Sequence, residues 1–115
     1  MWLFCKHGFF SAVRHNFKPD TILLRARVGG DLERLAAAHK VALDIKVTPD
    51  ADYAYRTELP LKTWAAIARR EAADIDYGNF KSAVHDGTAR DDAYMYVWTL
   101  MCALQDSDRA VRSVQ

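Results

Sequence analysis

The chain alternates apolar and polar positions over several short stretches, a pattern typical of strands with one buried face. Residues 21–28 show it most clearly, because Leu24 and Ala26 fall on one face while Arg25 and Arg27 fall on the other. This segment is therefore predicted to be a strand with an apolar face and a cationic face. Extended chain is also predicted for residues 2–7, 9–15, 42–48 and 53–59.

Glycine and turn residues separate these stretches. Gly8 predicts a bend or bulge that leaves residues 2–15 as one interrupted strand. The turn sequence at residues 49–52 predicts a hairpin between the two strands that flank it. We therefore expect a sheet of about four strands.

Apolar residues recur with the helical period elsewhere in the chain. Helices are predicted at residues 32–39, 61–73, 80–84 and 90–105. The last of them carries one apolar stripe that we expect to be buried, formed by Tyr94, Val97, Trp98, Met101 and Leu104. Residues 106–115 are polar and predicted to fray.

The predicted order β-β-α-β-β-α-α indicates an α+β fold. We expect a two-layer sandwich in which an antiparallel sheet carries its helices on one face, as a ferredoxin-like variant. The first strand would take the place of that plait's last strand. We expect a single domain over residues 1–105, followed by the frayed tail.

Composition adds few constraints on function. The chain has 115 residues, of which 50% are hydrophobic and 27% charged, so a disordered chain is excluded. Its net charge of +1 indicates no partner, and no apolar run is long enough to span a membrane. Cys5 and Cys102 are too far apart to suggest a disulfide framework; we expect buried thiols, and a bridge between them stays open. The cytoplasm is the expected compartment, because no signal sequence is recognisable.

Several segments together resemble an uncharacterised family of short bacterial single-domain proteins of unknown function. The matching segments are residues 6–15 (KHGFFSAVRH), 24–28 (LRARV), 31–35 (DLERL), 50–53 (DADY), 76–81 (DYGNFK) and 97–101 (VWTLM). This resemblance implies a single-domain protein, and it implies no reaction and no catalytic residue.

The polar face of the predicted sheet is the main candidate for function. Its predicted binding residues are Arg25, Arg27, Lys46 and Arg56, with Arg14 and Lys6 at the edge. They outnumber the carboxylates of Asp44 and Glu58, and arginine suits bidentate contact with carboxylate or phosphate. We therefore expect a non-enzymatic binding module that contacts an acidic partner protein. A solvated face with ion pairs such as Arg25–Glu58 is the alternative without function.

Two other functions remain open for this face. It could form a homodimer with a small-ligand pocket, by analogy with ferredoxin-like domains. Nucleic-acid binding is not favoured, because sheets that bind RNA carry stacking aromatics, whereas Tyr53 and Tyr55 are expected on the apolar side. Phe10 would lie on the polar face if Phe9 is the buried one, and the direction of Arg14 depends on that choice.

No pattern of catalytic or metal-binding residues is recognisable. Ser11 has no evident His/Asp relay, and the four histidines lack ligand spacing, so a metal site would require convergence in the folded chain. We predict no catalytic residue, no metal and no cofactor. The polar connector at residues 74–81 is expected to cap the following helix through Asn79 or Asp76.

Overall fold

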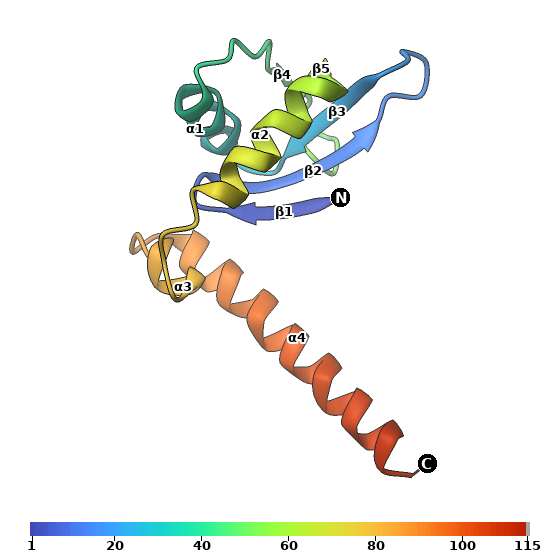
Figure 1. The fold of residues 1–115 in the computed structure, drawn as a ribbon, viewed down its shortest axis with the longest axis vertical. Helices are drawn as coiled ribbons and strands as arrows, with labels where there is room; N and C mark the ends of the chain where they lie inside the picture. Colours follow the sequence, from blue (N-terminus) through green and yellow to red (C-terminus); the bar gives the residue numbers. More distant parts are fainter. Residues whose placement is uncertain (115) are drawn as a thin grey trace. The chain divides into compact units, whose positions relative to one another are not determined.

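A computed structural model describes residues 1–114 and divides the chain into two compact units (Figure 1). The first unit is Met1–Asp76, and the second begins at Tyr77. The strands are β1 (Trp2–Cys5), β2 (Gly8–Arg14), β3 (Thr21–Ala26), β4 (Lys46–Val47) and β5 (Tyr55–Pro60). The helices are α1 (Gly29–His39), α2 (Leu61–Ala73), α3 (Phe80–Ala83) and α4 (Ala89–Ser113).

The first unit is a five-stranded antiparallel sheet in the order β1-β2-β3-β5-β4. The α+β class, the two layers and the antiparallel sheet are confirmed. β2 lies beside β3, in the place that we expected the first strand to take. The sheet has five strands because β1 is added outside β2.

Gly8 is part of a chain reversal, and the bulge that we expected there is wrong. β1 and β2 form a hairpin in which Cys5 pairs with Gly8, so Lys6 and His7 make a two-residue turn. Gly8 has a φ of +150°, a conformation that side chains disfavour. A glycine at this position lets the chain turn back on itself instead of continuing as one interrupted strand.

α1 and α2 cover one face of the sheet (Figure 1). The helical period predicted for both segments is confirmed, and its apolar residues Leu32, Leu35, Trp64 and Ile67 are all buried. They pack on the inward residues of the strands, which include Phe10, Ala12, Ile22, Leu24, Ala26 and Leu59. The side chain of Phe10 is fully buried, which settles the choice between Phe9 and Phe10.

The strand predicted at residues 42–48 is much shorter in the structure. Only Lys46 and Val47 pair with β5. Leu43 and Ile45 still pack on the core, as their alternation predicted, but from chain that forms no strand. Val47, which continues the same alternation, is exposed.

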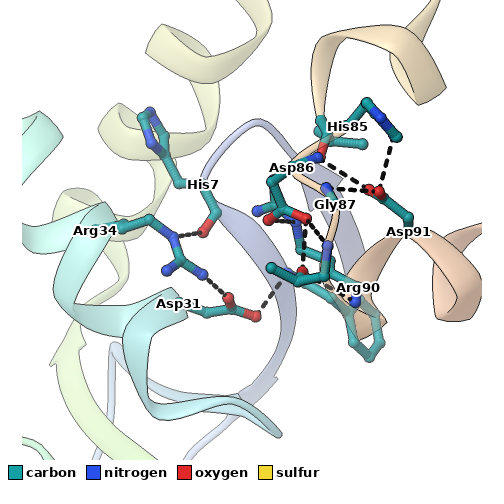
Figure 2. A network of polar contacts seen from close by, with 11 residues as sticks. His7, Asp31, Arg34, His85, Asp86, Gly87, Arg90 and Asp91 are labelled. Atoms are coloured by element: carbon teal, nitrogen blue, oxygen red, sulfur yellow. Dashed lines mark hydrogen bonds and ion pairs between the residues drawn. The ribbon is translucent and has the colours of Figure 1, made fainter.

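The second unit begins with two capped helices. Asn79 accepts a hydrogen bond from the Ser82 amide at 3.2 Å and so caps α3, as predicted. In the first turn of α4, the Asp91 carboxylate accepts hydrogen bonds from the amides of Asp86 and Gly87 in the preceding loop, at 3.1 and 2.8 Å (Figure 2). These contacts fix the start of α4, where Thr88 is the N-cap residue.

α4 corrects two expectations. It continues to Ser113, well into the segment predicted to fray, and the Arg112–Asp108 ion pair at 2.8 Å supports its last turns. Most of the stripe predicted to be buried is exposed: Trp98, Met101 and Leu104 are 51%, 57% and 60% exposed, whereas Tyr94 is half-buried and stacks on Phe80. Among residues 77–114, the short α3 packs near the start of α4, and the later part of the stripe extends beyond it. No helix among the described residues is long and apolar enough to cross a membrane.

Candidate functional site

The strand register places a row of side chains across the face of the sheet that α1 and α2 leave uncovered. Trp2 pairs with Ser11, Ser11 with Arg25, and the row continues to the last two strands. Directly paired residues point to the same side of a sheet. The row across the five strands is Trp2, Ser11, Arg25, Arg56 and Lys46. The grouping of Arg25, Lys46 and Arg56 on one face is therefore as predicted.

A second row of aromatic residues lies next to the first. Phe4 pairs with Phe9, and their rings stack with centroids 4.3 Å apart. The rings of Trp2 and Phe9 form a T-shaped pair with centroids 5.9 Å apart, and the Trp2 side chain is largely exposed. We call the combined surface the arginine–aromatic face, formed by Trp2, Phe4, Phe9, Ser11, Arg25, Arg27, Lys46, Tyr53 and Arg56.

Tyr53 contradicts the expectation that placed it on the apolar side. The guanidinium carbons of Arg25 and Arg27 lie 4.6 and 4.2 Å from its ring centroid, and Phe9 lies 6.4 Å away. Tyr53 precedes β5, so the alternation of that strand does not govern its direction. Tyr55 does pack against the core, as predicted. The cationic face therefore carries the aromatic residues that it was expected to lack.

Among residues 1–114, two arginines of this face, Arg25 and Arg27, have no carboxylate partner. Lys46 pairs with Asp44 at 3.0 Å, and Arg56 approaches Asp52 at 3.5 Å. Within residues 1–114, Arg25 and Arg27 form no ion pair; they donate to the Ser11 hydroxyl and the Asp52 carbonyl at 2.8 and 2.7 Å. In the same part of the chain, the buried Nε of Arg25 has no hydrogen-bond partner.

The proposed Arg25–Glu58 ion pair does not form. Glu58 instead pairs with Lys18 at 2.6 Å and with His15 at 3.0 Å. The hydrogen bond from Lys18 lowers the pKa of Glu58, and the charges of Lys18 and His15 add to this effect. The negative charge of Glu58 is therefore paired with Lys18 and His15, and it does not compensate the positive charge of Arg25.

The two predicted edge residues lie apart from the arginine–aromatic face. Arg14 pairs in register with Ile22, which points to the helix-covered side, and its guanidinium is 3.7 Å from Asp20. Phe10 and Arg14 are an even number of positions apart on β2, so Arg14 points to the same side of the sheet as the buried Phe10. Lys6 belongs to the hairpin turn and binds Asp76 at 3.0 Å.

A hollow of about 610 Å³ adjoins the face. It is lined by His15, Lys18, Leu23, Asp44, Lys46, Arg56, Thr57 and Glu58. Both signs of charge meet there, so the hollow has no strong preference for an anion. It extends the face at the side of Lys46 and Arg56.

On the opposite side of the first unit, two histidines meet a buried carboxylate. The Nε2 atoms of His39 and His7 lie 2.7 and 3.2 Å from Oε1 of Glu71. Cys5 is close by: burial raises its pKa to about 11, and the Glu71 carboxylate contributes to the shift. Its thiol is therefore neutral at physiological pH, and both Cys5 and Cys102 are free. This cluster was not predicted, because its members are far apart in the chain and share no recognisable spacing.

Ser11 is held in a structural role. It is buried, and its hydroxyl accepts a hydrogen bond from Arg25. His15, the histidine nearest in sequence to follow it, is engaged with Glu58, and its Nδ1 accepts from the amides of Phe17 and Lys18. The arrangement does not supply a base for Ser11.

No family model matched the chain, and neither did a curated protein or a solved structure. The resemblance to the uncharacterised bacterial family and the ferredoxin-like relationship of the sheet therefore stay predictions. The function must be argued from the two clusters described above.

Proposed function

We propose that this protein is a small non-enzymatic binding module whose arginine–aromatic face binds single-stranded nucleic acid. The observation that carries the proposal is the pair Arg25 and Arg27, without a carboxylate partner in residues 1–114, on the same face of the sheet as the exposed ring of Trp2. Guanidinium groups suit phosphates, and exposed aromatic rings stack on unpaired bases. The expectation against nucleic acid rested on missing aromatics, and that premise no longer holds.

The geometry favours a single strand over a duplex. Trp2 is 71% exposed at the edge strand, and Phe4 and Phe9 continue the aromatic surface inward. Bases stacked in a duplex do not offer their faces to side chains, whereas unpaired bases do. Arg25, Arg56 and Lys46 form a line across three neighbouring strands, and we expect a phosphate backbone to follow this line.

The acidic partner protein that the sequence favoured is the competing occupant. Guanidinium groups bind carboxylates as well as phosphates, so charge does not separate the two. The exposed tryptophan does, because base stacking uses it directly. Both cysteines are free thiols, which supports our placing the module in the reducing cytoplasm.

Truncation of Trp2 tests the proposal. We expect Trp2→Ala to weaken binding of a fluorescein-labelled single-stranded oligonucleotide by about 5- to 150-fold, the loss of one stacked base. Trp98→Ala is the matched control, because it removes another exposed tryptophan from α4 and should leave the affinity unchanged. Fluorescence anisotropy measures both.

The same titration includes three further probes. A duplex of the same sequence should bind more weakly than the single strand, and an acidic peptide should compete poorly. Light scattering of the free protein should give one 13.0 kDa chain, because a dimer through this face would cover it. Tight peptide binding with no oligonucleotide binding would contradict the proposal and favour an acidic protein as the partner of this face.

A further inference from the structure

Three elements of the first unit bring metal-binding side chains together. His7 is in the turn between β1 and β2, His39 is the last residue of α1, and Glu71 lies on α2. One ligand atom from each lies within 4.8 Å of the others. Glu71 and His39 are 7% and 8% exposed, while His7 is half-buried and reaches the surface.

We propose that His7, His39 and Glu71 form a binding site for a divalent transition-metal ion of the zinc class. Two imidazoles and one carboxylate are a donor set that zinc accepts, with a fourth position left open. Atoms bound to one tetrahedral zinc ion lie about 3.3 Å apart. The His7–Glu71 distance of 3.2 Å already matches, and the His39–Glu71 distance of 2.7 Å requires a small side-chain rotation.

The charge of the cluster supports an ion. The Glu71 side chain is 5% exposed, and among residues 1–114 it pairs with the two histidines and with no lysine or arginine. A buried carboxylate requires a compensating positive charge. A divalent ion supplies that charge and uses the two imidazoles as neutral ligands. The proposal is independent of the arginine–aromatic face, which none of these three residues enters.

The backbone on which His7 sits is held in place by α1. The His7 carbonyl accepts a hydrogen bond from Arg34 Nε at 3.0 Å (Figure 2). The Phe9 amide donates to the Asp31 carboxylate at 3.2 Å. Arg34 and Asp31 also bind each other. The same helix ends at His39, so one rigid element positions two of the three ligands.

Zinc titration of the untagged, metal-free protein tests the site. We expect saturable binding of one ion per chain by calorimetry and a rise in Tm when zinc is added. His7→Gln should weaken binding at least tenfold, because even removal of a group that merely orients a ligand costs about 10–100-fold. His7 is the preferred variant because it is partly exposed, and its melting curve without zinc verifies that it folds.

His15→Gln is the matched control. His15 also faces a carboxylate, Glu58, at 3.0 Å, but among residues 1–114 it is not part of a cluster with a second imidazole. This variant should bind zinc as the unmodified protein does. Glu71→Gln, checked for folding in the same way, should lose binding together with His7→Gln. The proposal is overturned if no saturable binding occurs, or if folded His7→Gln and Glu71→Gln bind zinc with unchanged affinity.

Discussion

Phe10→Ala is expected to lower the free energy of unfolding by about 3–5 kcal/mol, the cost of emptying a large core position. The Phe10 side chain has no exposed surface and packs between the sheet and the helices of the first unit. The loss includes both the buried apolar area and the cavity left behind, because a packed core relaxes little. Urea denaturation followed by circular dichroism measures the change.

Phe17→Ala is the matched control for this prediction. Phe17 is 89% exposed, so the same truncation should change stability by less than about 0.5 kcal/mol. Phe9→Ala should fall between the two, because Phe9 stacks on Phe4 at the surface of the sheet. A larger loss of stability for Phe9→Ala than for Phe10→Ala would mean that the opposite face of β2 points into the core.

Gly8→Ala is expected to destabilise the protein by about 3 kcal/mol, from backbone strain and overpacking together. At a φ of +150°, an added Cβ would lie 2.3 Å from Cγ of Asp31. Asp31 is 3% exposed and binds the Phe9 amide, so it cannot move aside without breaking that contact. Thermal unfolding should show the loss as a marked fall in Tm.

Gly30→Ala separates this effect from a general sensitivity to glycine replacement. Gly30 lies in α1, and the atoms nearest to a Cβ there belong to the guanidinium of Arg34, with Nη1 at 2.8 Å. Its replacement should cost much less than Gly8→Ala, because alanine favours a helix and a partly exposed arginine side chain shifts more easily than buried Asp31. Equal losses for the two variants would contradict the tight contact at Gly8.

Local periodicity was sufficient to predict much of the first unit. The alternation around Leu24 and Arg25 gave the two faces of β3, and the helical stripe through Trp64 and Ile67 gave the buried side of α2. Both signals depend on neighbouring residues only. The hairpin at Lys6 and His7 was missed because its two-residue turn lacks the asparagine–glycine type of signal.

The parts of the sites that were missed depend on contacts between distant segments. Tyr53 lies outside β5, so only packing against Arg25 and Arg27 shows its direction. His39 and Glu71 belong to different helices, and the sequence contains no spacing that links them. On α4 the stripe was real, but periodicity does not tell whether a partner covers it.

The most direct test of the arginine–aromatic face is charge reversal at Arg27, compared with charge reversal at Arg69. Arg27 is exposed beside Tyr53, whereas Arg69 is exposed on α2, which covers the opposite face of the sheet. Arg25 is avoided because it also holds the buried Ser11 hydroxyl. The two variants carry the same change in net charge, so a non-specific electrostatic effect would weaken both equally.

The measurement is oligonucleotide anisotropy for both variants over a range of salt concentrations. We expect Arg27→Glu to weaken binding by about tenfold or more at low salt and to reduce the salt slope by about 0.7, the value for one lost phosphate contact on a single strand. Arg69→Glu should bind as the unmodified protein does. Equal affinities for the two variants, or no dependence on salt, would contradict a nucleic-acid site on this face.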